Sequence, residues 1–345
     1  MTAIPARDLD LLVVGAGPTG IAIGAAAREA GLSVLLVERG ALCESIRGYP
    51  TGMVFFTTRE RLEIAGVPFT IANAKPTREQ ALAYYREVVR HWRVPFLLRH
   101  EVTRVERAGD GFVVDVEGPP GERTFAARAV ALASGYFGLP RRLGVPGEDL
   151  PWVRSRYVEP YEHFGERVLV VGAGNSAAEA ALELFRWGAR VILAHRGPGL
   201  KPGVKYWLKP DVENRLAAGE IEGLFETCVV AFEERDGRRV RLATPRGEEE
   251  REIDTAYVQV GYRPELELAR RLGVHIDPET LEPRVDPETC ESDVAGFYVA
   301  GTLLAGRFTD RIFIENSREH APRLVAHLRR RLGVVASAGD RGAGG

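Results

Sequence analysis

The sequence predicts an α/β protein with two Rossmann-like, three-layer dinucleotide-binding domains. Two glycine-rich turns support this prediction, GAGPTG at residues 15–20 and GAGNSA at residues 172–177. Each turn follows an apolar strand-like run and opens a helix-like run, which is the context that a dinucleotide turn needs. The length of 345 residues is sufficient for two domains that each bury a sizeable core.

The first turn is part of a complete dinucleotide fingerprint. The strand LDLLVV precedes Gly15, Gly17 and Gly20, a helix is expected to about residue 30, and the next strand, VLLVE, ends at Glu38. These glycines allow a tight turn, close approach of the backbone to a pyrophosphate and close packing of helix on strand, and the acid is placed to hydrogen-bond a ribose. A lone glycine turn has other uses, but this order of parts favours a nucleotide site.

The second turn differs from the first at the ribose position. Gly172, Gly174 and Ala177 occupy the three turn positions, and the following strand, VILA, ends in His195 and Arg196 instead of an acid. A basic strand end suits a 2′-phosphate, whereas an unmodified ribose has lost its carboxylate partner there. We therefore expect NADPH rather than NADH at this turn.

Four more residues around the second turn are candidates for nucleotide contacts. Lys201 and Lys205 follow the basic strand end and would add positive charge, although each lysine taken alone is more typical of a solvated loop. Asn175 and Ser176 are expected to cap the helix through their side chains, with phosphate contacts as a second role.

Two nucleotide domains in one chain of this size indicate a flavin in the first and a nicotinamide in the second. A bound flavin takes hydride from one partner and passes electrons to another that need not be present at the same moment. The residues predicted to contact FAD are Gly15, Gly17, Pro18, Thr19, Gly20, Glu38, Arg39, Tyr49, Phe56, Val102, Ser134, Gly135, Gly301 and Thr302. Those predicted to contact NADPH are Gly172, Gly174, Asn175, Ser176, Ala177, His195, Arg196, Lys201 and Lys205. Tyr49, Phe55 and Phe56 form an aromatic cluster that is more typical of a core than of a flavin site.

The domain boundaries follow from the remaining patterns. Residues 77–92 read as an amphipathic helix with a Thr-Gln capping box, short alternating strands follow, and residues 311–332 read as a terminal helix. We expect a discontinuous FAD-binding domain, residues 8–155 plus 266–334, around an NADPH-binding domain, residues 156–265. The tail, residues 335–345, is small and polar enough to be disordered.

Composition excludes several classes of partner. The net charge of −2 gives no basic field for nucleic acid, and no apolar run reaches the length of a membrane span. The first residues lack the pattern of a signal peptide, so a cytoplasmic location is expected. The three cysteines are widely spaced and form neither a CxxC motif nor a zinc pattern, so no metal is expected.

Five separated stretches resemble the bacillithiol disulfide reductase family, the YpdA-type flavoproteins with a thioredoxin-reductase-like fold. They are residues 48–69, 75–89, 174–184, 204–216 and 313–321. The resemblance covers nearly the whole chain to about residue 330. It implies a homodimeric FAD enzyme that uses NADPH to reduce oxidised bacillithiol, a low-molecular-weight thiol.

The chain departs from that family at Thr19, where the family fingerprint has a cysteine. A threonine hydroxyl cannot act as the thiolate that attacks a disulfide, so the catalytic residue is left open. His320 on the terminal helix is a candidate proton donor, although a surface or interface histidine is the more ordinary role. The stretch Ala300-Gly301-Thr302 lacks the Asp that thioredoxin reductases have, which agrees with the narrower family.

Other functions fit parts of the same pattern. A ferredoxin or flavodoxin–NADP reductase of this fold also lacks CxxC and passes single electrons to a small redox protein. A flavin monooxygenase is not favoured, because those enzymes carry a His-containing motif shortly before the second turn and no His occurs between His100 and His163. A non-enzymatic flavin or nucleotide sensor is the alternative from a different class.

Overall fold

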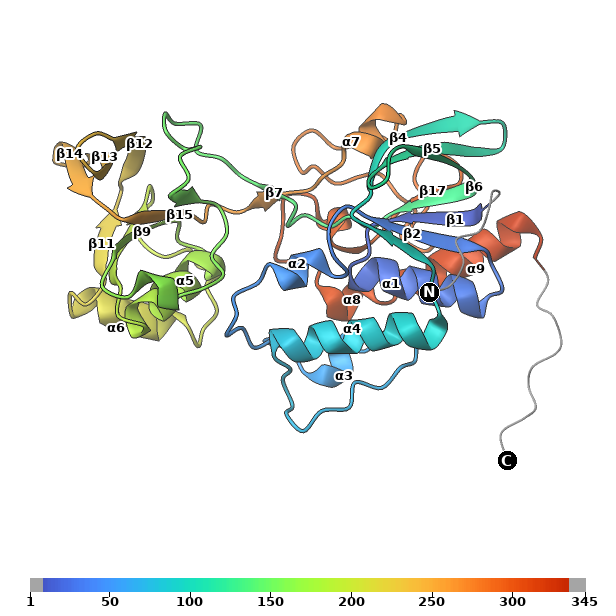
Figure 1. The fold of residues 1–345 in the computed structure, drawn as a ribbon, viewed down its shortest axis with the longest axis horizontal. Coiled ribbons are helices and arrows are strands. Elements are labelled where there is room, and N and C mark those ends of the chain that lie inside the picture. The colour runs from blue at the N-terminus through green and yellow to red at the C-terminus, as the bar shows by residue number, and fades with distance from the viewer. Residues whose placement is uncertain (1–8, 335–345) are drawn as a thin grey trace. The chain divides into compact units, whose positions relative to one another are not determined.

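The chain forms two compact units in the computed structural model, which describes residues 9–334. One unit contains the residues up to Arg47, Gly52–Leu139 and the residues from Arg263 on, and the other contains Gly48–Thr51 and Pro140–Tyr262 (Figure 1). The first unit is thus discontinuous, but its N-terminal part ends at Leu139 and not at residue 155. The reason is that β8 (Val153–Arg154) pairs with β15 (Thr255–Val258) in the sheet of the second unit. The tail, residues 335–345, lies outside the described residues.

The first unit is built on a seven-stranded sheet in the order β3-β2-β1-β6-β5-β4, with β17 also paired to β6. The strands are β1 (Leu9–Val14), β2 (Val34–Glu38), β3 (Phe96–Leu98), β4 (Glu101–Ala108), β5 (Gly111–Glu117), β6 (Arg123–Leu132) and β17 (Phe297–Val299). The ten-residue β6 pairs antiparallel with β5 along its first half and parallel with β17 along its second half. One long strand therefore joins a parallel sheet to an antiparallel meander.

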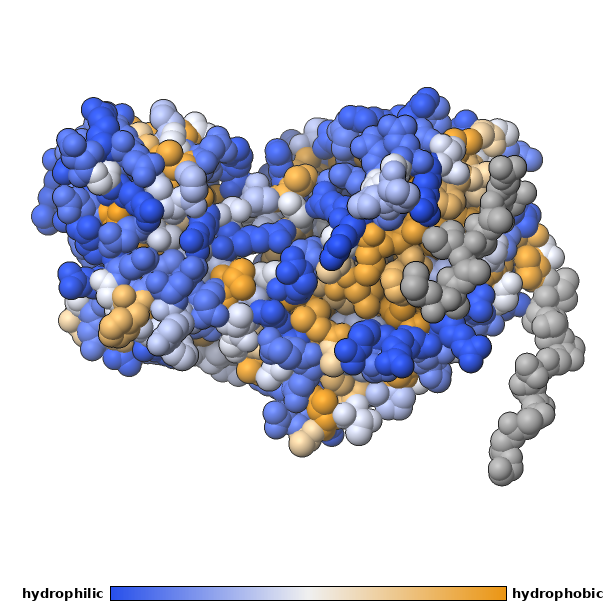
Figure 2. Space-filling view, viewed as in Figure 1, coloured by the Kyte–Doolittle hydropathy of each residue, from blue (hydrophilic) through white to orange (hydrophobic). Residues whose placement is uncertain are grey.

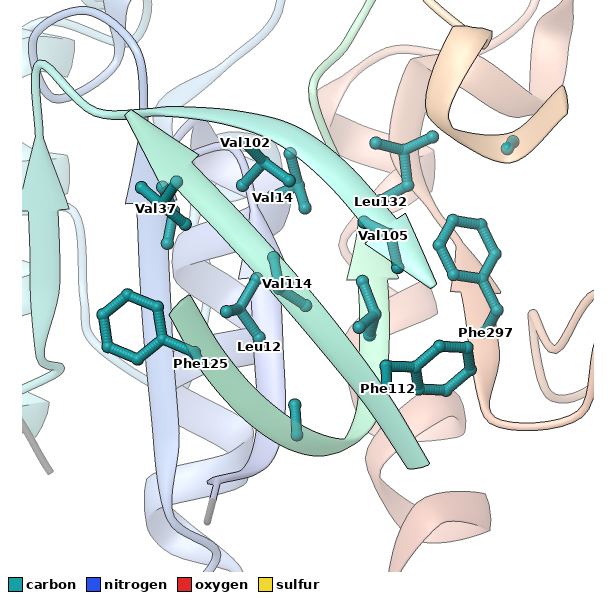
Figure 3. Close-up of a cluster of buried hydrophobic side chains, with 14 of the residues drawn as sticks. Leu12, Val14, Val37, Val102, Val105, Phe112, Val114, Phe125, Leu132 and Phe297 are labelled. Atoms are coloured by element: carbon teal, nitrogen blue, oxygen red, sulfur yellow. The ribbon is translucent and has the colours of Figure 1, made fainter. Parts of the chain in front are cut away.

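Helices and the meander complete the three layers of the first unit. Helix α1 (Pro18–Glu29) packs against α4 (Arg78–Trp92) and α9 (His320–Leu332), and these helices lie on one side of the sheet (Figure 1). The other face is covered by the meander and by α7 (Glu267–Arg271), where apolar side chains such as Leu12, Val114 and Phe297 interleave in one cluster (Figure 3).

Local signals in the sequence explain where these helices begin and end. The predicted capping box is present at α4, because Thr77 Oγ1 accepts from the Gln80 N–H and Gln80 Oε1 accepts from the Thr77 N–H. The expected terminal helix over 311–332 is instead divided into α8 (Ile314–Ser317) and α9. The remaining short helices are α2 (Glu44–Arg47), α3 (Arg59–Leu62) and the 3₁₀ turns Tyr161–His163 and Gly301–Ala305.

The second unit is a smaller three-layer Rossmann-like unit. Its parallel sheet has the order β11-β10-β9-β15-β8, with β9 (Arg167–Val171), β10 (Arg190–His195) and β11 (Glu222–Phe225). Helices α5 (Asn175–Arg186) and α6 (Lys209–Ala217) pack together beside it, and an antiparallel sheet of β12 (Cys228–Glu234), β13 (Arg238–Thr244) and β14 (Gly247–Glu252) forms the third layer. The two-stranded pair β7 (Leu139–Pro140) and β16 (Tyr262–Arg263) stands where the chain passes between the units.

The visible surface of both units is mostly hydrophilic, with an apolar area on the first unit (Figure 2). The exposed large apolar side chains of the described residues are Val54, Phe96, Tyr161, Phe164, Trp187, Tyr206 and Trp207. Within residues 9–334, no helix is both long enough and apolar enough to cross a membrane.

Candidate active site and nucleotide sites

The first glycine turn has the geometry of a phosphate-binding turn. Gly15 has a φ of +106°, and a Cβ there would lie 2.6 Å from the Ala133 carbonyl oxygen. A Cβ at Gly20 would lie 2.0 Å from the Gly15 carbonyl oxygen, so both positions require glycine. A Cβ at Gly17, the N-cap of α1, would meet nothing within 4 Å. The space at Gly17 is open at a helix N-terminus, where a phosphate is stabilised.

Glu38 is held at the end of β2 by the turn itself. Its Oε2 accepts from the Ala16 N–H and its Oε1 accepts from the Gly40 N–H, both at 2.9 Å. Each carboxylate oxygen keeps a second acceptor site. The carboxylate is therefore fixed and still able to accept hydrogen bonds from ribose hydroxyls.

A cavity of about 350 Å³ opens beside this carboxylate, and we call it the first-unit cavity. The predicted residues that line it are Gly15, Glu38, Arg39, Val102 and Ser134. His100 and Ser134 also line this cavity, and their side-chain atoms His100 Nε2 and Ser134 Oγ are buried without a hydrogen-bond partner among the described residues. Buried polar atoms are nearly always paired, so the lining fits a polar ligand such as the adenosine part of FAD.

Arg39 makes contacts that the sequence did not indicate. Its Nη1 donates to Glu265 Oε1 at 2.9 Å and lies 3.9 Å from Glu101 Oε1. All three residues also line the first-unit cavity. The guanidinium is thus shared between the half-buried carboxylate of Glu265 and the exposed carboxylate of Glu101, beside the predicted nucleotide site.

Four residues from separate segments meet at the start of α1, and we call them the Thr19 cluster: Thr19, Gly301, Ser317 and His320. Thr19 Oγ1 lies 3.4 Å from Ser317 Oγ. Gly301 has a φ of +76°, and a Cβ there would lie 2.8 Å from Thr19 Oγ1. Beside the cluster, a Cβ at Gly135 would lie 3.5 Å from Thr302 Oγ1. The structure therefore brings together five of the residues predicted from three distant stretches of sequence.

His320 is fixed in one tautomer by the backbone. The Gly301 N–H donates to His320 Nδ1 at 3.0 Å, so Nδ1 is an acceptor and the neutral ring carries its hydrogen on Nε2. Burial lowers the pKa of His320, and the positive charge of Arg323 lowers it further. The ring is neutral near pH 7 and offers a hydrogen bond from Nε2 rather than an acidic imidazolium.

The buried cysteines are unsuited to attack on a disulfide. Cys43 is fully buried, and burial followed by the charge of Glu38 raises the pKa of its thiol. Burial raises the pKa of Cys290 to about 11. Cys228 is exposed and opens β12 in the second unit. Because the thiolate is the nucleophile, Cys43 and Cys290 are inert at neutral pH.

The aromatic cluster is divided between different surroundings. Phe55 is 5% exposed, as expected for a core residue. Phe56 packs edge-to-face on Phe313 with ring centroids 5.3 Å apart. Tyr49 belongs to the second unit and Phe56 to the first. The flavin contacts predicted for Tyr49 and Phe56 stay predictions.

The second glycine turn repeats the first with one change. Gly172 has a φ of +144°, and a Cβ there would lie 2.4 Å from the Gln259 carbonyl oxygen. A Cβ at Gly174 would meet nothing within 4 Å, which again leaves space at a helix N-terminus. The third position accommodates the methyl group of Ala177, which is fully buried.

The predicted side-chain cap at this turn is wrong. Gly174 is the N-cap of α5, and no side chain caps the helix. Asn175 already lies inside the first helical turn, so its side chain faces the loop after β10 instead. Its Oδ1 accepts from the Lys205 N–H at 2.8 Å, and its Nδ2 donates to the Gly203 carbonyl at 3.3 Å. Asn175 therefore ties that loop to the nucleotide turn.

The end of β10 carries a basic cluster, His195, Arg196 and Lys201. Burial lowers the pKa of His195, and the charges of Lys201 and Arg196 lower it further, so the three side chains are near one another. Arg196 and Lys201 form no ion pair within the described part of the chain. Lys205, by contrast, pairs with Glu179 Oε1 at 2.5 Å. Two uncompensated cations fit a 2′-phosphate, and Lys205 is partly neutralised.

The family model of the pyridine nucleotide-disulphide oxidoreductases matches residues 12–301. This chain belongs to that family. It is 35% identical to the bacilliredoxin reductase Bdr of Bacillus subtilis over 93% of this chain and 97% of that protein. It is 32% identical to the structure of the bacillithiol disulfide reductase Bdr (YpdA) from Bacillus cereus, with a TM-score of 0.91 over 94% of this chain and 100% of the other.

The structure of a thioredoxin reductase from T. acidophilum has a similar fold, with a TM-score of 0.73 and 19% identity over 95% of this chain and 99% of the other. These matches confirm the predicted fold class, a thioredoxin-reductase-like protein with two Rossmann-like units. Family membership also shows that the chain is an enzyme, an oxidoreductase of the kind that uses FAD and NADPH. It excludes the alternative function of a non-enzymatic sensor.

Proposed function

We propose that this enzyme transfers hydride from NADPH, bound to the second unit, to FAD, bound to the first, and passes the electrons to the disulfide of a low-molecular-weight thiol such as bacillithiol. The observation that supports this most directly is the contrast between the two strand ends. The fixed Glu38 carboxylate would suit an unmodified ribose, and the basic cluster would suit a 2′-phosphate. Similarity to the Bdr proteins over more than nine-tenths of the chain supports the disulfide acceptor.

The residues of the chain have separable tasks in this reaction. The open positions at Gly17 and Gly174 admit pyrophosphates to the N-termini of α1 and α5. Arg196 and Lys201 bind the 2′-phosphate, and Asn175 keeps their loop against the turn. When bound, FAD supplies the capacity to take two electrons from NADPH and hold them for a second partner. The overall balance is one disulfide, one NADPH and one proton converted to two thiols and NADP⁺.

The final transfer to the disulfide lacks a protein thiol at the position of Thr19. The hydroxyls of Thr19 and Ser317 cannot form a mixed disulfide, and Cys43 is buried as a protonated thiol. We therefore propose that reduction of bacillithiol disulfide is slow in this enzyme and limits its turnover, whereas reduction of FAD by NADPH does not depend on a protein thiol. The two Bdr proteins are named for different acceptors. One name gives a bacilliredoxin, and the other gives the disulfide of bacillithiol.

A side-by-side assay of acceptors tests the proposal. The purified enzyme is supplied with NADPH and, in separate reactions, with bacillithiol disulfide, oxidised bacilliredoxin, ferredoxin, quinone or oxygen, and NADPH consumption is measured. We expect one of the two disulfides to give the highest kcat/KM. A higher value with ferredoxin would replace the proposal by the ferredoxin–NADP reductase alternative.

The dimeric state and the cytoplasmic location stay predictions. Light scattering coupled to size-exclusion chromatography measures the mass directly, and a mass of one chain at micromolar concentration would contradict the expected homodimer.

A further inference from the structure

His100 lies at the first-unit cavity but was not among the predicted site residues. It stands between β3 and β4, and its N–H donates to the Glu38 carbonyl oxygen at 3.0 Å. His100 is 7% exposed and lines the same cavity as Glu38. The histidine is thus attached to the strand end that is placed for the ribose.

The hydrogen bonds of the ring determine which nitrogen carries the hydrogen. His100 Nδ1 lies 2.8 Å from the Leu98 carbonyl oxygen. A carbonyl oxygen only accepts, so Nδ1 is the donor and, in the neutral ring, Nε2 is an acceptor with a free lone pair. Gly118 fixes the ring position, because its Cα packs so closely that a Cβ would lie 2.6 Å from His100 Cγ.

The acceptor of this ring is unsatisfied. His100 Nε2 is buried and has no partner within residues 9–334. Ser134 Oγ is also buried without a partner and lines the same cavity. Two residues with such atoms line one cavity, which points to a polar ligand that supplies the missing partners, since a buried acceptor without a donor destabilises the protein.

We propose that His100 Nε2 accepts a hydrogen bond from the adenosine part of FAD and makes this cavity selective for adenosine. This inference rests on the proposed binding of FAD to the first unit. Adenosine offers two kinds of donor, the 6-amino group of the base and the ribose hydroxyls. Because the fixed Glu38 carboxylate already provides two acceptors for the hydroxyls, the amino group is the donor that most needs another partner.

The experiment compares three dinucleotides on the full-length protein stripped of flavin. These are FAD, its hypoxanthine analogue, which lacks the amino donor, and its 2′-deoxyadenosine analogue, which lacks one hydroxyl. Quenching of flavin fluorescence gives each Kd. The variants are H100F, which removes the acceptor, H100Q, which restores an acceptor oxygen, and H91F as a control at an exposed histidine of α4.

We expect the unmodified protein to bind FAD about three- to tenfold more tightly than the hypoxanthine analogue, which corresponds to one neutral hydrogen bond. The 2′-deoxyadenosine analogue should also bind less tightly, because Glu38 accepts from the ribose hydroxyls, but that loss should be the same in H100F. The preference for FAD over the hypoxanthine analogue should disappear in H100F, return at least partly in H100Q and be unchanged in H91F. Since the unmodified protein must itself discriminate, the test does not depend on the folding of H100F.

Two results would overturn the inference. Equal affinity for FAD and its hypoxanthine analogue, or a preference for FAD over that analogue that persists in H100F, would show that His100 is structural while FAD binding stands. The absence of saturable binding of any dinucleotide would reject both His100 and the proposed flavin site.

Discussion

Replacement of Arg196 by Ala should separate the use of NADPH from the use of NADH. Arg196 follows the last residue of β10 and forms no ion pair in the part of the chain that the structure describes. Its charge is therefore available for a 2′-phosphate that NADH lacks. His195 contributes little charge, because burial and its two cationic neighbours lower its pKa.

The size of the effect follows from the partners of each cation. A hydrogen bond between arginine and phosphate is worth about 1.5–3 kcal/mol, so Arg196→Ala should raise the KM for NADPH roughly ten- to a hundredfold and leave that for NADH nearly unchanged. Lys201→Ala should have a smaller effect of the same kind. Lys205→Ala should change the ratio least, because Lys205 is paired with Glu179 at 2.5 Å.

Steady-state kinetics with both coenzymes and an artificial acceptor, together with calorimetric binding of 2′,5′-ADP, measure this difference. Arg190→Ala is the matched control, because Arg190 is an exposed arginine at the opposite end of the same strand. Equal losses for NADPH and NADH in Arg196→Ala would place Arg196 in the scaffold. A rise in the KM for NADPH in Lys205→Ala as large as that in Arg196→Ala would refute the argument that ion pairing with Glu179 makes Lys205 less important.

Three other groups of results are expected, which concern the flavin, the thiols and the turn glycines. The protein should purify yellow with FAD, and extraction of FMN or failure of the apoprotein to take up flavin would contradict the first site. Anaerobic bleaching of the flavin by NADPH should survive replacement of all three cysteines by Ser. Reduction of bacillithiol disulfide should be no slower in that variant. It should be about tenfold faster or more in Thr19→Cys, because the N-terminus of α1 favours a thiolate at residue 19. Fast turnover by the native enzyme that is lost when one native cysteine is replaced would show that this cysteine is the reactive thiol. Gly20→Ala should lower the free energy of unfolding by about 1–3 kcal/mol, because its methyl meets the Gly15 carbonyl. Gly174→Ala should lower the free energy of unfolding by less than about 1 kcal/mol but weaken NADPH binding about tenfold. Equal unfolding midpoints of the two glycine variants in calorimetry would contradict this distinction.

The sequence was informative where a site depends on neighbours along the chain. The turn glycines, Glu38 and the Thr77 capping box lie at fixed spacings from a strand or a helix, so their positions follow from local structure. Arg196 is similar, because a strand end determines where the next residue points. Such features could be predicted before any tertiary contact was known.

Contacts between distant segments could not be predicted in this way. Lys205 faces Glu179 rather than solvent, and Asn175 binds a loop rather than its own helix end, because each side chain responds to a segment about thirty residues away. His100 offered one signal, a polar residue between apolar strand segments, but its unsatisfied nitrogen appears only when Glu38 and Ser134 surround the same cavity.

The discontinuity of the first unit sets an order for synthesis and folding on the ribosome. Most of the second unit is a single stretch, Pro140–Tyr262, which can fold while the ribosome continues translation. The first unit cannot be completed until β17 has been synthesised and pairs with β6. The contacts of Ser317 with Thr19 and of His320 with Gly301 also form only after these late residues have been synthesised. A chain that stops after Tyr262 would therefore contain the complete second glycine turn, which we propose to bind NADPH, but lack the segment that packs against the start of α1. Its incomplete first unit would be the part that chaperones and proteases encounter.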